Sequence, residues 1–451
     1  ERHWLAPAAS SSPAIPALPS REGGPALRLI LEVIAAEQGV APHTLDPATN
    51  FRQLGVDSMI ALRLIHRLAE ETGSDLGHRD LETHGTPEAL ARHLAAAEGA
   101  AASSAGGSAG RDGPWRSAMS EGQKGLWVVQ SLHPQSGVYN VPLAFRVTEI
   151  DRDLLDRSCR ALLEGFPILG AGVVDDGEEL ALAEAGTGDP RRDDLLRRIA
   201  LPKDIDVLDF LGQRVRRPFD LGAEVPVRFE LLRGGKLGAG EEIFLIVVHH
   251  IAIDGVSAAV VARHFWQTYR SLAAGERPAL PTAADYAEFV AWERDLMQSG
   301  KGAGQRAYWL ERLRDAPPEL ELPADHPPRA DGGIDGRSLD VTLSPALTAA
   351  ARQRAAALGI SAASFYLGAL AILLYRYSGQ DDLLIGVPTL RRPAQRFQET
   401  VGYCANMIAL RLSVEGGQEA ATLLREVHGR LLEGLDHADY PFAAIARDLG
   451  G

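Results

Sequence analysis

The segment HHIAIDG at residues 249–255 combines residue types that could carry out chemistry. It follows a short apolar run at 243–248 that is rich in β-branched residues and predicts a buried strand. Adjacent side chains on a strand point to opposite faces, so only one of the two histidines lines a given cleft. An imidazole at a strand end can accept a proton near neutral pH. Asp254 could then fold back to fix the loop, and Gly255 would allow a close approach of substrate or backbone.

Two other interpretations of the paired histidines stay open. They could be a structural pair at a strand end, or they could bind zinc. A zinc site needs a third ligand at suitable spacing, and the sequence has neither an HExxH segment nor a cysteine pair. We therefore predict no metal.

A second candidate is Ser58, which follows Asp57 and precedes an amphipathic helical run. An exposed serine at a helix N-terminus lies where the macrodipole and free N–H groups favour a phosphate. An ordinary N-cap is the alternative interpretation. No histidine near Ser58 indicates a Ser–His nucleophile.

Two segments rich in Ala, Ser, Gly and Pro, residues 6–20 and 97–113, predict flexible linkers. Between them, helical periodicity at 27–34 and 58–68, and a Thr86-Pro87 helix start, predict a small helical bundle. The remainder predicts an α/β block. Its expected strands are 243–248 and 383–387, and its expected helices are 258–272, 283–298, 305–314, 345–357, 361–377 and 420–433.

The composition excludes several classes of protein. The length of 451 residues suits about three compact units, and the net charge of −14 argues against a protein that coats nucleic acid. Cys159 and Cys404 have no spacing suited to a disulfide framework or a metal, which favours a reducing, cytoplasmic setting. No apolar run reaches the length of a bilayer span, so we expect no membrane partner. The N-terminal residues do not match a signal peptide, and the missing initiator Met suggests a chain cut from a longer one.

FRQLGVDSMIALRLIHRLAEETG at 51–73 resembles the acyl and peptidyl carrier protein family at its modification motif. The resemblance implies that Ser58 carries a covalent 4′-phosphopantetheine, whose thiol holds an acyl chain as a thioester. LGVDSM is more similar to carriers of polyketide modules than to those of peptide modules.

HHIAIDG resembles the HHxxxDG motif of condensation domains in nonribosomal peptide synthetases. The family's other motifs resemble, in order, SEGQKGLWVVQSLHPQSGVYNVP (120–142), DYAEFVAW (285–292), VGYCANMIALR (401–411) and HADYPF (437–442). The resemblance implies an α/β fold of two chloramphenicol-acetyltransferase-like lobes with the active site in a tunnel between them.

The resemblance also implies roles for individual residues. His250 would be the catalytic residue, within a site that includes His249, Asp254 and Gly255. Asp254 would be structural and held by Arg392, which lies in the Gly-x-Pro-x-x-x-Arg segment of GVPTLRRP. Asn406 belongs to the fifth motif and would give structural support.

The resulting division is a linker at 1–20, a carrier domain at 21–96, a linker at 97–113, and condensation-domain lobes at 114–320 and 321–451. Two departures from the family pattern stand out. GFPILGAGV at 165–173 lacks the charges expected of the second motif, and the seventh motif and final strands are missing, so we expect a truncated second lobe.

These features predict an amide-forming acyltransferase for secondary-metabolite biosynthesis, in a nonribosomal peptide or hybrid polyketide–peptide synthetase. A carrier directly upstream of a condensation domain is normally its donor. The implied partners are a downstream aminoacyl carrier, a phosphopantetheinyl transferase and an upstream synthase module. An epimerisation domain and a non-catalytic recruitment domain of the same fold are the alternatives.

Overall fold

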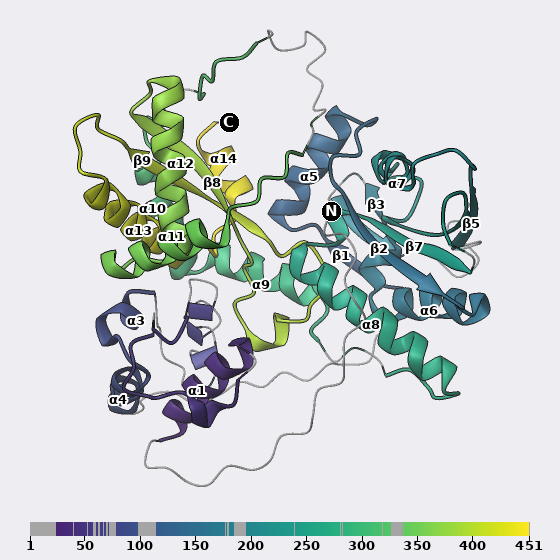
Figure 1. The fold of residues 1–451 in the computed structure, drawn as a ribbon, viewed down its shortest axis with the longest axis horizontal. Coiled ribbons are helices and arrows are strands. Elements are labelled where there is room, and N and C mark those ends of the chain that lie inside the picture. Colours follow the sequence, from purple (N-terminus) through teal and green to yellow (C-terminus); the bar gives the residue numbers. More distant parts are fainter. Residues whose placement is uncertain are drawn as a thin grey trace.

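The computed structural model describes residues 24–450 apart from 39, 52, 57–59, 62–63, 66, 69–70, 72–77, 98–113, 176, 178–179, 185–194, 239, 280, 282, 318, 326–335 and 337. Three groups of elements are visible in Figure 1: a small helical unit and the two lobes of the large block.

The small unit is entirely helical in its described part. Further helical residues lie between Ile60 and Glu71. Apolar side chains from residues 26–34, 64–68, 81 and 90–94, together with Phe51, form one separate core. The labelled helices are α1 (Pro25–Gln38), η1 (Pro42–Thr44), α3 (His78–His84) and α4 (Pro87–Ala97).

The first lobe is built on a four-stranded sheet in the order β2-β7-β6-β5, in which only β5 and β6 are parallel. Strand β7 is buried along almost its whole length, as expected for the centre of a sheet. Helices α6 and α8 pack side by side below this sheet (Figure 1). The four strands are β2 (Asn140–Thr148), β5 (Leu196–Leu201), β6 (Val227–Gly234) and β7 (Glu241–His249).

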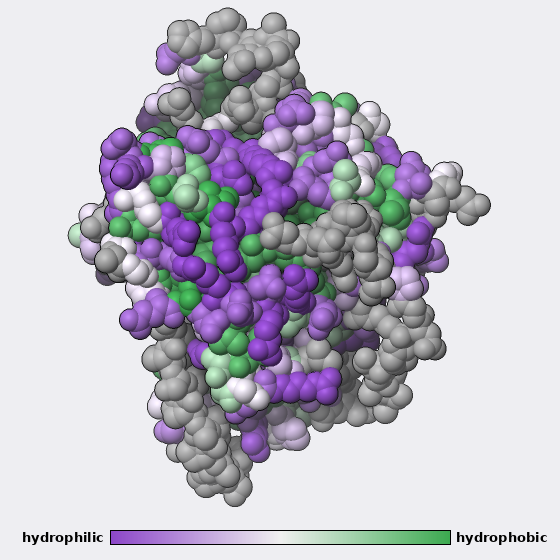
Figure 2. All heavy atoms as spheres, turned by 90° about the vertical axis from the view of Figure 1, so that its right-hand side faces the viewer, coloured by the Kyte–Doolittle hydropathy of each residue, from purple (hydrophilic) through white to green (hydrophobic). Residues whose placement is uncertain are grey.

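Helices and a smaller antiparallel sheet, in the order β1-β4-β3, complete the first lobe. The outer face of the first lobe is mostly hydrophilic (Figure 2). The other elements are β1 (Arg116–Ala118), α5 (Glu121–Leu132), α6 (Arg152–Gly165), η2 (Pro167–Gly170), β3 (Ala171–Asp175), β4 (Leu180–Glu184), α7 (Val207–Arg216), η4 (His250–Ala252), α8 (Gly255–Ala273) and α9 (Tyr286–Gln298).

The second lobe has an antiparallel strand pair, β8 and β9, covered by helices. Helix α13 packs on β9 and on α12, and it also lies against α3 of the small unit. Its elements are α10 (Gly300–Arg312), α11 (Pro345–Leu358), α12 (Ala362–Ser378), β8 (Asp382–Thr389), η5 (Gln395–Phe397), β9 (Asn406–Ser413), α13 (Ala420–Asp436) and α14 (Phe442–Asp448).

Helix α10 belongs to the second lobe by packing, because Trp309 and Leu313 share a core with β9, α13 and α14. It begins earlier than the periodicity of 305–314 predicts, since the Ser299 side chain caps it. A Cβ at Gly302 would lie 2.0 Å from the Leu296 carbonyl oxygen, so this glycine lets α10 start directly after α9.

Side-chain caps explain why many helices of the large block start where they do. A serine or aspartate accepts a hydrogen bond from a free N–H of the first turn, which replaces the missing intrahelical partner. The capping residues include Ser120 (α5), Asp151 (α6), Asp206 (α7), Asp254 (α8), Asp285 (α9), Ser344 (α11) and Ser361 (α12).

The predicted fold class, a helical bundle followed by a two-lobed α/β block, is confirmed. Within the described residues, no single helix is long and apolar enough to cross a membrane. Helices α11 and α12 reach that length and composition only as a pair, which is bent by 102° at the break between them.

Candidate active site

His250 opens η4 directly after β7 and is held by two short contacts. Its backbone N–H donates to the Tyr139 carbonyl at 2.7 Å, and its Nδ1 lies 2.6 Å from the Ile253 carbonyl oxygen. A carbonyl oxygen only accepts, so Nδ1 carries the proton and donates. In the neutral ring, Nε2 therefore keeps the free lone pair and is the atom that could accept a proton.

The Tyr403 ring stands edge-on to the His250 imidazole, with ring centroids 5.2 Å apart. Burial raises the pKa of the Tyr403 phenol, so it stays protonated at neutral pH. Tyr403 approaches closely because Gly122 faces it: a Cβ at Gly122 would come within 2.6 Å of Tyr403 Cε1. An aromatic wall from the second lobe thus borders the candidate base of the first lobe.

His249 points the other way and is completely buried. Its Nδ1 accepts from the Ile251 N–H at 3.1 Å, and its Nε2 lies 3.2 Å from Gln130 Oε1, to which it donates. Burial, with smaller contributions from the charges of His250 and Arg228, lowers the pKa of His249 to about 3. Both ring nitrogens are occupied, so this geometry gives His249 the task of shaping the loop.

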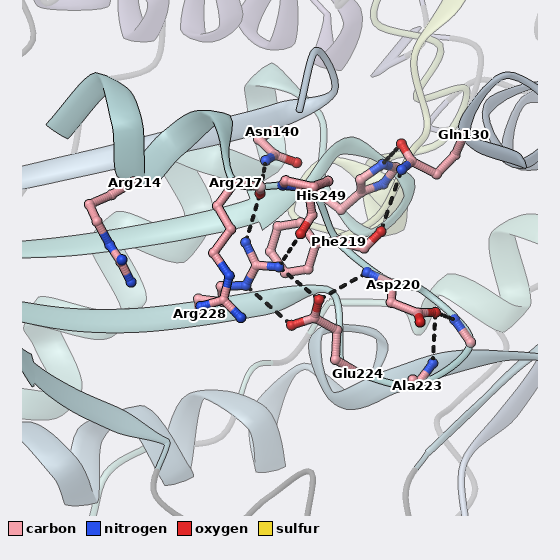
Figure 3. A network of polar contacts seen from close by, with 12 residues as sticks. Gln130, Asn140, Arg214, Arg217, Phe219, Asp220, Ala223, Glu224, Arg228 and His249 are labelled. Atoms are coloured by element: carbon pink, nitrogen blue, oxygen red, sulfur yellow. Dashed lines mark hydrogen bonds and ion pairs between the residues drawn. The ribbon is translucent and has the colours of Figure 1, made fainter. Parts of the chain in front are cut away.

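A polar network lies behind His249 (Figure 3). The buried Arg228 guanidinium donates to the carbonyls of Arg217 (2.8 Å) and Pro218 (2.5 Å), and it pairs with Glu224 at 2.7 Å. It also lies 3.7 Å above the Phe219 ring, which meets the His249 ring edge-on. These contacts hold the segment that packs on His249.

Asp254 is buried and forms a two-armed ion pair with Arg392, with N–O distances of 3.0 and 2.8 Å. It also caps α8 through the Ser257 N–H at 2.8 Å and accepts from the Cys404 N–H at 3.1 Å. The partner predicted for Asp254 is therefore the one found. Because Arg392 is only 2% exposed, the pair joins the His250 loop to the second lobe without solvent screening.

Ser257 adds a second connection at the same junction. Its hydroxyl accepts from Arg392 at 3.0 Å and from the Gly402 N–H at 3.1 Å, and it donates to the Gly402 carbonyl at 2.9 Å. A Cβ at Gly402 would lie 1.9 Å from the ring of Tyr286, so only glycine fits there. The Tyr286 hydroxyl in turn donates to the Tyr403 carbonyl at 2.9 Å.

A second buried ion pair joins Arg391 to Glu293 on α9. Glu293 also accepts a hydrogen bond, at 2.7 Å, from the backbone N–H of Glu121, the first residue of α5. The Arg391 guanidinium lies over the rings of Phe289 and Trp292, at 5.3 and 5.2 Å. The consecutive arginines 391 and 392 thus attach one segment of the second lobe to two different elements of the first.

Helix α5 fixes the candidate loop from a third direction. Ser120 and Gln123 form a capping box at its start. The Gln123 amide also donates to the Ile251 carbonyl at 2.7 Å, in the turn that carries His250. The segment 120–142, which resembles the first motif of the family, therefore contacts the HHIAIDG loop through Gln123.

Asn406 lies at the start of β9, away from His250, and is fully hydrogen-bonded. Its amide donates to the carbonyls of Ala438 and Tyr440, both at 2.8 Å, and its oxygen accepts from the Phe442 N–H at 2.9 Å. It thereby fixes the turn between α13 and α14. The fifth and sixth resembling segments meet at this residue.

We expect Asn406→Ala to lower the free energy of unfolding by about 2 kcal/mol or more, because it leaves three buried backbone groups without partners. Asn406→Asp should cost more, since a carboxylate oxygen would then face two carbonyl oxygens. Urea unfolding followed by circular dichroism measures both variants. Equal stability of Asn406→Ala and wild type would contradict this role.

The lowered pKa of His249 in the folded chain predicts that the protein loses stability in acid. Between pH 6.5 and about 3 the unfolded chain binds a proton at this position and the folded chain does not. The free energy of unfolding should therefore fall by up to about 1.4 kcal/mol per pH unit as the pH is lowered through this window. His249→Gln should reduce that slope in urea titrations at successive pH values; an unchanged slope would assign the acid sensitivity to other groups.

Gly255 is exposed at the first turn of α8, and a Cβ there would meet no atom within 4 Å. Its φ is not in the left-handed region, so its backbone does not require glycine. A side chain at this position would therefore point into open space at the start of α8.

Ser58 and Asp57 lie outside the described residues. The residues on either side form a turn with Gly55 at φ 74° and a helix described from Ile60 onward. A site for a group attached through phosphate at a loop-to-helix junction is compatible with these neighbours.

The junction contains partners that sequence reasoning did not identify: Gln123, Ser257, Glu293, Arg391 and Tyr403. The capping pattern Ser-x-x-Gln was a readable signal for Gln123, and the charge Glu293 within an otherwise apolar helix face was a signal for a buried pair. Nothing in the sequence indicated that Tyr403 meets His250.

Comparisons with known proteins support the assignment of both parts. The family described as the condensation domain matches residues 116–450, and the family described as the phosphopantetheine attachment site matches residues 28–94. Polyketide synthase PksN of Bacillus subtilis (strain 168) is 32% identical over 339 residues, which is 74% of this chain. A linear gramicidin synthase of Brevibacillus parabrevis is 31% identical over 407 residues, or 89% of the chain. The chain spans 6% and 5% of the lengths of these two relatives.

Solved structures give the same fold. The first condensation domain of the calcium-dependent antibiotic synthetase, in complex with a substrate analogue, matches with a TM-score of 0.61 and 25% identity over 75% of this chain and 79% of that one. The X-domain complex with OxyB from teicoplanin biosynthesis matches with a TM-score of 0.65 over 77% of each chain. At 22% identity the latter likeness concerns the fold alone.

Condensation domains of nonribosomal peptide synthetases are acyltransferases that form amide bonds, and the attachment-site family carries a covalent 4′-phosphopantetheine. The chain belongs to the condensation-domain family, with a phosphopantetheine carrier domain ahead of it, as found in nonribosomal peptide and hybrid polyketide–peptide synthetases.

Proposed function

We propose that this chain joins an acyl group held on Ser58 to the amine of an aminoacyl group held by a downstream carrier, forming an amide. The observation that carries the proposal is the fixed tautomer of His250, whose Nδ1 is committed to the Ile253 carbonyl and whose Nε2 is free. The LGVDSM segment and the similarity to a polyketide synthase support a polyketide-derived donor.

The phosphopantetheine arm, when attached, supplies the thioester that activates the acyl group. Gly255 borders open space beside the His250 loop, where a slender ligand could approach without displacing a side chain. We assign the carrier domain to 21–96 and the lobes to 114–320 and 321–451, except that α10, which lies within the first of these two ranges, packs into the core of the second lobe.

The chain's own residues orient the attacking amine and accept one proton from it. Amide formation from a thioester is downhill, so the protein mainly has to bring the amine into place and remove its proton. His250 Nε2 accepts that proton or orients the amine by a hydrogen bond. The C–N bond would form as the C–S bond of the thioester breaks, and the proton lost by the amine would balance the thiol that is released. The Asp254–Arg392 pair keeps its loop in position, and the Tyr403 ring limits the space on one side.

The carrier assignment makes a prediction that does not depend on the condensation reaction. Coexpression with a phosphopantetheinyl transferase should add the mass of one arm to the chain, and Ser58→Ala should abolish that gain. Intact-protein mass spectrometry measures it, with Thr49→Ala in the same domain as the matched control. Modification of the Ser58→Ala variant would place the arm elsewhere and contradict the assignment.

A further inference from the structure

Three side chains with metal-binding atoms converge on the small unit, outside the site described above. Asp80 and His84 lie four residues apart on α3, which places them on one face of the helix. His93 lies on α4. One potential ligand atom from each of the three residues falls within 4.8 Å of the other two.

The two imidazoles lie against each other and keep their ring nitrogens free. Their centroids are 4.2 Å apart, with an angle of 25° between the ring planes. Among the described residues, neither His84 nor His93 has a side-chain hydrogen bond or ion pair, and they contact each other through the ring stack. Ring nitrogens that need not give up a protein partner can bind a metal ion at lower cost.

The frame that carries these side chains is well defined. Helices α3 and α4 are joined by Gly85 and Thr86 alone. Gly85 has φ 59°, and its carbonyl accepts from the Phe51 N–H at 2.9 Å. The Thr86 hydroxyl caps α4 through the Ala89 N–H at 3.2 Å. Both helices are anchored in the core of the small unit by buried leucines, among them Leu81, Leu90 and Leu94.

The donor set selects the class of metal. Two neutral imidazoles and a carboxylate suit Zn²⁺ and its neighbours Co²⁺, Ni²⁺ and Cu²⁺, whereas Ca²⁺ and Mg²⁺ prefer oxygen ligands throughout. Both cysteines of the chain are buried in the large block, so no thiolate competes for the ion.

We propose that Asp80, His84 and His93 bind one zinc-class divalent ion, which clamps α3 to α4. Three protein ligands leave a fourth tetrahedral position for water. Because α3 also lies against α13 of the second lobe, an ion bound here would stiffen a helix through which the carrier domain contacts the condensation domain. All three proposed ligands lie on the small unit, so metal binding there does not depend on amide formation. The sequence did not reveal this cluster because its third member comes from a different helix.

The test is a titration of the full chain, prepared with a chelator and without a polyhistidine tag. Zn²⁺ is added in competition with a chromogenic indicator, and Co²⁺ absorption reports the coordination geometry. We expect one site with four-coordinate Co²⁺ bands, and at least a tenfold loss of Zn²⁺ affinity in His93→Gln, His84→Gln and Asp80→Asn.

His43→Gln is the matched control, because His43 is an exposed histidine of the same unit that is not part of the cluster. It should bind Zn²⁺ like wild type, and circular dichroism should show that all variants fold. The proposal is overturned if wild type does not compete with the indicator, or if His43→Gln loses as much affinity as His93→Gln.

Discussion

Replacing His250 by alanine should slow amide formation at least about a hundredfold, the lower end of what a positioned acid–base group contributes. The variant should fold normally, since the imidazole makes one side-chain hydrogen bond, to Ile253, and is not part of the buried ion pairs. The loss should appear in the rate of the chemical step, with carrier loading unchanged. Single-turnover product formation, analysed by chromatography and mass spectrometry, gives that rate.

His133→Ala is the matched control, because His133 is the C-cap at the far end of α5 from Gln123, the residue through which this helix bonds to the His250 loop. Unchanged product formation in His250→Ala would contradict the catalytic role and favour a recruitment domain of the same fold. Solvent deuterium appearing at the α-carbon of a loaded aminoacyl group would instead favour epimerisation. The two alternatives therefore give results that differ from each other and from condensation.

Replacing Arg392 by alanine should lower the free energy of unfolding of the large block by about 3–5 kcal/mol, because it leaves the Asp254 carboxylate buried without its partner. The same change removes contacts to the Ser257 hydroxyl and to the Thr400 carbonyl. Urea unfolding monitored by tryptophan fluorescence measures the loss. If Arg392→Ala is too unstable to purify, Arg392→Lys can be measured instead. It keeps the charge, so its free energy of unfolding should lie between those of wild type and Arg392→Ala.

The ion pair between Arg263 and Glu399 provides the matched control. It also links α8 to the 389–404 segment, but both side chains are about half exposed. Solvent screening limits such a pair to about 1 kcal/mol or less, so Arg263→Ala should change little. The double variant Asp254→Ala/Arg392→Ala should lose less than the sum of the single variants, because no lone charge stays buried. Equal losses from Arg392→Ala and Arg263→Ala would contradict the proposed function of this buried pair.

Local patterns in the sequence were sufficient to predict the strand before His250, the loop after it and most helices of the large block. The reason is that the apolar run at 243–248 and the periodic helices are determined by burial, which leaves a readable spacing. The Asp254–Arg392 pair was predictable only through the resemblance, since 138 residues separate the two side chains.

The remaining contacts of the site depend on how the lobes meet. Tyr403 reaches His250 because Gly122 has no side chain to block its ring, while the neighbouring Gly402 makes room for the ring of Tyr286. Glu293 is buried because Arg391 comes from a distant segment to pair with it. Such partners are set by tertiary packing, and residue spacing within one element contains no information about them. Ser58 stays a prediction from the carrier motif.

Amide formation from the carrier is tested most directly by a single turnover with an acyl group loaded on the Ser58 arm and a soluble aminoacyl thioester as acceptor. Intact-protein mass spectrometry follows the acyl group on the carrier, and chromatography follows the amide. We expect the acyl group to leave Ser58 at the rate at which the amide appears, and both rates to fall sharply in His250→Ala. An acyl group that stays on Ser58 while acceptor is present, with the chain folded, would contradict this expectation.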